Sequence, residues 1–181
     1  MENEIKEVLI TSEQMKKRVT ELGALISEKY EGKKLLVIGV LKGSVIFFAD
    51  LIREITIPVE IDFIAASSYG ASAVSSGIVS LKKDVSCDVC GKNILIVEDI
   101  IDTGFTIKYI KDLFQARKAE SVSVCCALDK PSRRDKDINV AVDYVGFEIP
   151  DEFVVGYGLD YAELYRNLPD VCVLNPEVYS K

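Results

Sequence analysis

Apolar positions along this chain follow two patterns, which together predict alternating helices and strands. Thr11 and Gln14 match a helix-capping box, so a helix is expected to begin there. Helical spacing then continues through Met15, Val19, Leu22, Leu25 and Ile26, and recurs at Phe47, Phe48, Leu51 and Ile52 and at Ile107, Ile110 and Phe114. Short apolar runs, typical of buried strands, occupy residues 35–40, 59–66, 78–81, 93–97, 121–128, 141–147 and 171–174.

This alternation predicts an α/β fold in which helices flank a mostly parallel, twisted sheet, with some peripheral strands. The length of 181 residues suits a single domain spanning residues 1–181. Residues 67–77 break the pattern, because they are rich in serine and glycine, and they predict a mobile loop.

Charge and cysteine content narrow the possible partners and compartment. The chain carries 22 basic and 29 acidic side chains, a net charge of −7, which argues against nucleic acid or an anionic membrane as the main partner. The first residues are polar and no apolar run approaches the ~20 residues that span a bilayer. With an odd number of cysteines as well, we expect a cytoplasmic protein.

The chain has no histidine, which excludes Ser-His-Asp and Cys-His catalysis and histidine-ligated zinc. Cys87 and Cys90 form a C-x-x-C pair, but a zinc site would need two further ligands. The other cysteines lie in apolar strand patterns, so a turn with two incidental thiols is the favoured interpretation.

The most informative segment is the predicted strand 93–97, which runs into acidic residues and then Asp102-Thr103-Gly104-Phe105-Thr106 before a helix. Ligands of parallel sheets bind beyond the carboxyl ends of strands, where threonine hydroxyls and free backbone N–H groups can wrap a phosphate. The carboxylates of Glu98 and Asp99 fit such a site if the ligand also carries hydroxyl groups and a cation, as a phosphorylated sugar with Mg²⁺ does. On spacing alone, an ordinary solvated loop that caps a helix remains an alternative.

The run from Val97 to Thr106 resembles the phosphoribosyl pyrophosphate (PRPP) motif of type I phosphoribosyltransferases. Leu41-Lys42-Gly43-Ser44 resembles the pyrophosphate loop of that family, and Ser68-Tyr69 resembles the start of its flexible lid. Lys130, with Arg133 and Arg134, matches its purine-facing strand end. The segment 145–161 is similar to the hypoxanthine-guanine branch of the family, and the resemblance implies the type I fold with a small hood and a lid loop.

The resemblance also implies a role for each matching residue. Glu98 and Asp99 would hold the ribose hydroxyls, directly or through metal-bound water. The 5′-phosphate would lie against Asp102, Thr103, Gly104, Phe105 and Thr106, with Asp102 as the general base. Mg²⁺ is expected because the leaving pyrophosphate is strongly anionic, and its candidate ligands are Glu98, Asp99 and Asp160.

The remaining assignments concern pyrophosphate and the base. Lys42, Gly43 and Arg166 would bind pyrophosphate, with a cis peptide at Leu41–Lys42. Lys130 would donate to the 6-oxo group of the purine, Phe153 would stack on its ring, and Val154 would read its edge. Asp160 would lie near the base. Ser68 and Tyr69, in the lid, would close over the reaction. Taken singly, Lys130 could be a surface lysine, Phe153 a core residue and Arg166 a solvated side chain.

The expected reaction transfers the 5-phosphoribosyl group from PRPP to hypoxanthine or guanine, giving IMP or GMP and pyrophosphate. The alternatives are a xanthine-preferring enzyme and, with less support, a non-enzymatic PRPP-binding regulator. The resemblance also implies a homodimer or homotetramer.

Overall fold

A computed structural model describes residues 4–68 and 79–180 of the chain. Its helices are α1 (Ser12–Lys29), α2 (Val45–Glu54), α3 (Phe105–Ala116) and the short α4 (Pro176–Tyr179), with a 3₁₀ turn η2 (Pro131–Arg133). Its strands are β1 (Ile5–Ile10), β2 (Leu35–Val40), β3 (Val59–Ser68), β4 (Val79–Lys83), β5 (Asn93–Ile101), β6 (Ser121–Asp129), β7 (Tyr144–Glu148), β8 (Val154–Val155) and β9 (Val171–Leu174).

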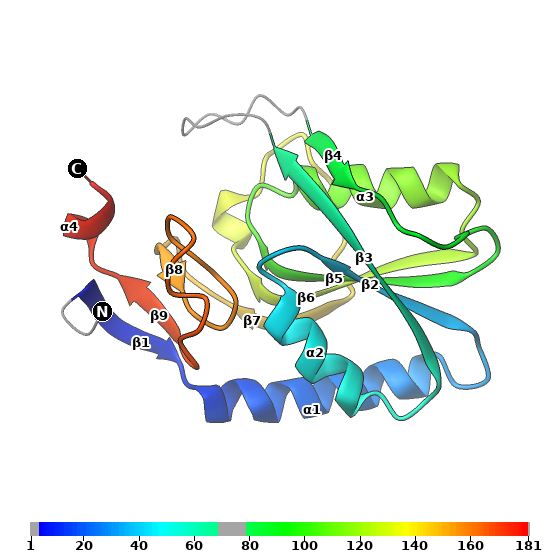
Figure 1. The fold of residues 1–181 in the computed structure, drawn as a ribbon, viewed down its shortest axis with the longest axis horizontal. Coiled ribbons are helices and arrows are strands. Elements are labelled where there is room, and N and C mark those ends of the chain that lie inside the picture. Colours follow the sequence, from blue (N-terminus) through cyan, green and yellow to red (C-terminus); the bar gives the residue numbers. More distant parts are fainter. Residues whose placement is uncertain (1–3, 69–78, 181) are drawn as a thin grey trace.

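A six-stranded sheet in the order β4-β3-β2-β5-β6-β7 forms the centre of the molecule. Strands β3, β2, β5, β6 and β7 are parallel, and β4 joins the edge antiparallel to β3. Helices α1 and α2 cover one face of this sheet and α3 covers the other (Figure 1). The predicted α/β architecture with a mostly parallel sheet is confirmed.

The core has two halves, one on each face of the sheet. All six residues of β2 are buried, as expected for a strand covered on both faces. On the first face, Met15, Val19, Leu22, Phe47 and Leu51 pack over Val37 and Leu95. On the second face, Ile107, Ile110 and Phe114 pack over Ile38 and Ile96.

Helix α1 begins as its sequence predicts. The Thr11 side chain accepts from the Gln14 backbone N–H, and the Gln14 side chain accepts from the Thr11 backbone N–H, so the capping box is formed. Gly23 allows α1 to approach α2, because a Cβ there would lie 2.6 Å from the Glu54 Cβ. Leu25 lies in α1 as predicted but is 48% exposed, because the buried stripe passes through Leu22 and Ile26 beside it.

A second sheet of three antiparallel strands, β1-β9-β8, lies beside the main sheet and forms a hood. It brings the two ends of the described chain together (Figure 1). The patterns predicted β9 with its observed bounds but missed β1, β8 and α4. β1 is mostly exposed and β8 has only two residues, so neither carries a clear apolar pattern.

Several strand boundaries differ from the prediction because pairing partners set them. β5 continues past Val97 to Ile101, since β6 pairs with it up to Ile101↔Asp129. β7 begins at Tyr144 rather than at 141, and β3 extends two residues into the predicted loop. The rest of that loop, residues 69–77, lies outside the described residues. In the described ranges no helix is both long and apolar enough to cross a membrane.

Candidate active site

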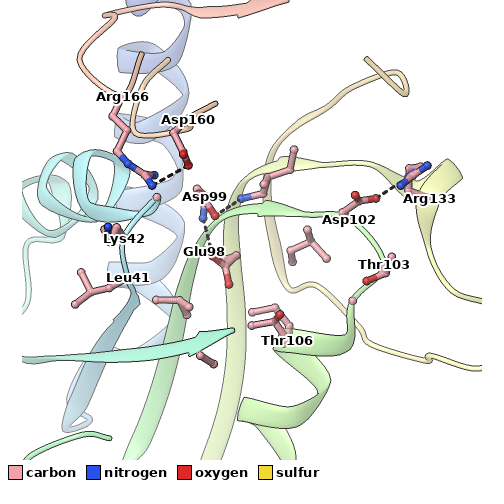
Figure 2. Close-up of a pocket in the computed structure, with 17 residues that line it drawn as sticks. Leu41, Lys42, Glu98, Asp99, Asp102, Thr103, Thr106, Arg133, Asp160 and Arg166 are labelled. Carbon is pink, nitrogen blue, oxygen red and sulfur yellow. Dashed lines mark hydrogen bonds and ion pairs between the residues drawn. The ribbon is translucent and has the colours of Figure 1, made fainter. Parts of the chain in front are cut away.

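A cavity of about 460 Å³ opens at the carboxyl ends of β2 and β5, above the N-terminus of α3 (Figure 2). This position follows from the sheet order, because parallel strands end at the same edge. The lining residues come from five segments: Val40 to Gly43, Ala66, Glu98 to Gly104 with Thr106 and Ile107, Arg133, and Asp160 with Arg166.

Glu98 is the most buried carboxyl group of the cavity, with 7% of its surface exposed. Burial raises its pKa well above the usual range, and the neighbouring negative charge of Asp99 adds to the shift. The Asp99 backbone N–H donates to Glu98 Oε1 at 3.3 Å. A buried carboxyl group at this position can form hydrogen bonds with a sugar hydroxyl.

Asp99 lies directly against the loop that follows β2. A Cβ at position 43 would lie 1.5 Å from Asp99 Oδ2, so a side chain there would force Asp99 or the loop to move. On the other side, a Cβ at Gly158 would lie 2.1 Å from the Gly43 carbonyl oxygen, and Gly158 has a φ of +101°. The Leu41–Lys42 peptide is cis, as the resemblance implied.

Two basic side chains border this loop, and both are already paired with carboxylates. Arg166 Nη2 lies 2.8 Å from Asp160 Oδ1, and its Nη1 donates to the Gly158 carbonyl at 2.9 Å (Figure 2). Lys42 Nζ donates to Glu163 Oε2 at 2.9 Å, and Arg166 Nη2 lies 3.3 Å from the same oxygen. The hydrogen bond from Lys42 lowers the pKa of Glu163, and the weaker effect of the hydrogen bond from Arg166 lowers it further.

The segment before α3 lines one end of the cavity. Gly104 occupies the position before the helix with a φ of +91°, a conformation that favours glycine. Thr103 and Thr106 line the cavity beside it, and the first N–H groups of α3 have no partner within the helix. Phe105 is not among the residues that line this cavity.

Asp102 stands between this cavity and a second one. Arg133 Nε donates to Asp102 Oδ1 at 3.2 Å, and Arg134 Nη1 donates to the Asp102 carbonyl at 3.1 Å. The negative charge of Asp102 raises the pKa of Arg133. From the sequence, Arg133 was noted but given no contact of its own. Arg133 follows β6, and β6 pairs with β5, so its approach to the residues after β5 could have been inferred from that pairing.

The second cavity measures about 440 Å³ and lies between β5 and the hood. It shares Ile100, Asp102, Arg133 and Asp160 with the first cavity, and its other lining residues are Lys130, Asp151, Glu152, Phe153, Val154, Leu159 and Tyr179. Apart from Phe105, the predicted phosphate residues and base residues therefore line two adjoining cavities that share Asp102.

Lys130 is buried at the rim of this second cavity, with 8% of its surface exposed. Its Nζ donates to the Glu152 carbonyl at 2.6 Å, and burial lowers its pKa. Phe153 is 37% exposed, so it is a cavity wall and not a core residue. Neither Leu159 nor Tyr179 was singled out from the sequence; Tyr179 stands in the short C-terminal helix, where no pattern marked it.

A divalent cation would find only part of a ligand set in the described chain. No group of three or more acidic or cysteine side chains within residues 4–68 and 79–180 is arranged to hold a metal. The oxygens of Asp99 and Asp160 are nevertheless the hard ligands that Mg²⁺ prefers, and Mg²⁺ commonly takes one or two carboxylates plus phosphate oxygens and water. The site therefore fits a cation that arrives with a phosphorylated ligand.

Two more pairs of residues were discussed from the sequence, Ser68 with Tyr69 and Cys87 with Cys90. Ser68 is the last residue of β3, and Tyr69 lies outside the described residues. Cys87 is partly buried and Cys90 is exposed, both as free thiols, and burial raises the pKa of Cys87.

Comparison with known proteins agrees with this geometry. The model of the phosphoribosyl transferase domain family matches residues 7–162. A hypoxanthine-guanine phosphoribosyltransferase of Bacillus subtilis (strain 168) is 54% identical over 179 residues, which cover 99% of this chain and 98% of that protein. A bifunctional protein TilS/HprT of Listeria monocytogenes is 48% identical over the whole chain, which spans 28% of that longer protein.

Among solved structures, the crystal structure of a hypoxanthine phosphoribosyltransferase from Staphylococcus aureus superposes with a TM-score of 0.95. The two chains are 49% identical, and the matched region covers 100% of this chain and 97% of the Staphylococcus aureus chain. The chain therefore belongs to the phosphoribosyltransferase family, within its hypoxanthine-guanine branch.

Proposed function

We propose that this enzyme transfers the 5-phosphoribosyl group of PRPP to hypoxanthine or guanine, forming IMP or GMP and releasing pyrophosphate. The observation that carries the proposal is the meeting of two cavities at Asp102, one lined by phosphate-binding groups and the other by Lys130 and Phe153. A nucleoside monophosphate has the same two-part character. Its phosphate and sugar suit the first cavity, and its base suits the second.

In this proposal, each part of PRPP faces groups of matching chemistry. The 5′-phosphate accepts from backbone N–H groups at the start of α3 and from the hydroxyls of Thr103 and Thr106. Glu98 and Asp99 hold the ribose hydroxyls. The pyrophosphate faces Lys42, Gly43 and Arg166, where it replaces the carboxylate of Glu163 as the partner of the two basic side chains.

The purine is held by direct contacts in the second cavity. Phe153 stacks on the ring, the backbone of Val154 reads its edge, and Lys130 Nζ donates to the 6-oxo group. An adenine amino group at that position would place donors opposite each other, and sites built to pair one group can reject its analogue by roughly 10⁴-fold. The same contacts leave the 2-position unspecified, so xanthine remains a rival substrate.

Asp102 acts as the general base of the reaction. The bond from the purine nitrogen to C1′ forms as the bond from C1′ to the pyrophosphate oxygen breaks. Asp102 takes or shares the proton on purine N7, and Arg133 orients its carboxylate. The ring oxygen of the sugar stabilises the oxocarbenium character that develops at C1′.

We propose Mg²⁺ as the cofactor, held by Asp99 and Asp160 together with substrate oxygens and water. When bound, it neutralises charge on the leaving pyrophosphate. Glu98, which lines the same cavity, contributes through the ribose hydroxyls or through metal-bound water. Asp160 becomes available when Arg166 turns from it toward pyrophosphate.

The deciding experiment incubates the protein with PRPP, Mg²⁺ and each of hypoxanthine, guanine, xanthine and adenine, and separates the products by liquid chromatography. We expect IMP and GMP, with AMP negligible. Comparable turnover of adenine would contradict the role of Lys130. Preferred turnover of xanthine would favour the xanthine enzyme, and tight PRPP binding without any product would favour a regulator.

The proposal extends to assembly and compartment. Val45 and Ile46 on α2 are each 40% exposed, which suits burial against a second copy in a homodimer or homotetramer. Light scattering after size-exclusion chromatography would give the oligomeric state. We propose the cytoplasm as the compartment, in agreement with five free cysteines.

A further inference from the structure

We propose that Tyr179 is a further positioning residue of the purine pocket, where its ring fixes the orientation of Phe153. The Tyr179 ring stacks on the Phe153 ring with centroids 4.8 Å apart and an interplanar angle of 26°. Both rings line the second cavity. Tyr179 lies beyond residues 7–162, which the family model matches, so the motifs shared by the family do not account for it.

Phe153 needs such support because little else covers it. It is 37% exposed and directly precedes β8, a strand of only two residues. Its backbone carbonyl accepts from the Leu174 N–H at 2.9 Å, so β9 fixes the main chain but leaves the ring free to rotate. Stacking with Tyr179 removes much of that freedom before a base arrives, and an already ordered wall binds its ligand more tightly.

The hood holds Tyr179 in place through several independent contacts. Helix α4 starts at Pro176 and is capped by Asn175, whose side chain accepts from the Glu177 backbone N–H at 3.3 Å. The Tyr161 ring meets Phe153 edge-on, with centroids 5.7 Å apart, and its hydroxyl donates to the Val178 carbonyl at 3.4 Å. The aromatic cluster of Phe153, Tyr161 and Tyr179 therefore joins the C-terminal helix to the base cavity.

This inference rests on the proposed function, and it predicts a selective effect on the base. Replacing Tyr179 by leucine keeps apolar volume but removes the flat ring. We expect Tyr179→Leu to raise the KM for hypoxanthine and guanine by about 3- to 10-fold, as loss of one aromatic pair implies. The kcat and the KM for PRPP should change by less than about twofold. Tyr179→Phe, which keeps the ring, should retain the wild-type KM.

A binding measurement separates positioning from general damage. Calorimetric titration with GMP and with ribose 5-phosphate compares ligands that differ only in the base. Tyr179→Leu should weaken GMP by the same 3- to 10-fold factor, about the worth of one aromatic pair, and leave ribose 5-phosphate unchanged. Val178→Ala is the matched control, because it alters packing in the same helix without removing a ring that lines the cavity.

Three results would overturn the inference: unchanged GMP affinity in Tyr179→Leu, equal weakening of both ligands, or tighter GMP binding. The last would mean that Tyr179 competes with the base for Phe153. If the wild-type protein bound no GMP and made no IMP or GMP, the proposed function itself would fail. If the wild type was active and Tyr179→Leu behaved identically, only the role of Tyr179 would fail.

Discussion

At the scale of single residues, this site works with carboxylates whose surroundings differ. The chain has no histidine, so proton transfer near neutral pH falls to an acidic or basic side chain. The side chain of Asp102 is 42% exposed and is held by Arg133, whereas Glu98 is buried beside Asp99. This difference supports the proposed division of roles, in which Asp102 accepts a proton and Glu98 holds ribose hydroxyls.

Substitution of Asp102 by asparagine tests the general-base assignment. The amide would keep the size of the side chain but could not accept the purine proton. We expect kcat to fall by about 10²- to 10⁴-fold, with a much smaller change in the KM for PRPP. Initial rates of IMP formation measure both quantities. Asp112→Asn, which removes an equivalent carboxylate paired with Lys108 on the exposed side of α3, is the control. An unchanged kcat in Asp102→Asn would mean that Asp102 only positions the ligand.

Substitution of Glu98 by glutamine tests the raised pKa through stability. The folded pKa of Glu98 lies above its ordinary value of 4.5, so the folded state binds more protons than the unfolded state between these two values. Stability is therefore lost as pH rises through this window, and Glu98→Gln removes the loss. We expect the Tm of the variant to exceed that of the wild type at pH 8 and the difference to shrink toward pH 5. For a chain of this size, each kcal/mol gained in the free energy of unfolding raises the Tm by about 2–4 °C.

Thermal unfolding at several pH values measures this difference. Glu60→Gln serves as the control, because that carboxylate is exposed and paired with Lys92. A Tm difference that does not vary with pH would contradict the assignment. Loss of activity in Glu98→Gln despite higher stability would agree with a functional group held at a cost to the fold.

At the scale of elements, the site depends on backbone segments that approach each other closely. The loop after β2 passes between Asp99 of β5 and Gly158 in the segment after β8. Glycine at positions 43 and 158 permits this approach, because a side chain at either position would collide with its neighbour. The geometry around the loop after β2, where we propose that pyrophosphate binds, therefore depends on three segments that are far apart in the sequence.

Gly43→Ala should disturb the site more than the fold. The new methyl group would force either the loop or the Asp99 side chain to move, and a displacement of about 1 Å at reacting groups can cost about 100-fold in rate. We expect kcat/KM for PRPP to fall by roughly that factor. Gly32→Ala is the comparison, because position 32 has a φ of +72° but no atom within 4 Å of a new Cβ. It should lower the Tm and leave kcat/KM unchanged; an equal loss of kcat/KM in both variants would count against the close-approach argument.

At the scale of the whole molecule, an acidic protein must bind a highly anionic substrate. The net charge of −7 opposes PRPP, and the basic groups at the pyrophosphate end, Lys42 and Arg166, are already paired with carboxylates. For the proposed reaction we therefore expect a cation to accompany the substrate, and the carboxylate oxygens of Asp99 and Asp160 suit Mg²⁺.

Removal of divalent metal should consequently abolish the reaction. We expect an excess of chelator to lower the rate of IMP formation by at least about 100-fold and added Mg²⁺ to restore it. A parallel Tm measurement shows whether the chelator also affects the fold. Full activity without divalent metal would refute the charge argument.

Some features of the protein depend only on neighbouring residues and can be predicted from the chain alone. The capping box at Thr11, the helical spacing of α3 and the buried runs of β2 and β9 are local patterns, and the structure has each of them. The PRPP motif is also local, since one strand end and one helix start supply all of it. The roles proposed for its residues therefore rest on sequence alone, and the substitutions described above test them.

Other features depend on residues that are distant in the sequence, and they become visible only in the folded molecule. β5 reaches Ile101 because β6 pairs with it, and Asp102 is held by Arg133, which is 31 positions away. Tyr179 stacks on Phe153 because β9 returns the chain to the hood. A local pattern records the preference of a segment for helix or strand. Which surfaces then meet is set by sheet pairing and by the packing of the whole core, and no single segment contains that information.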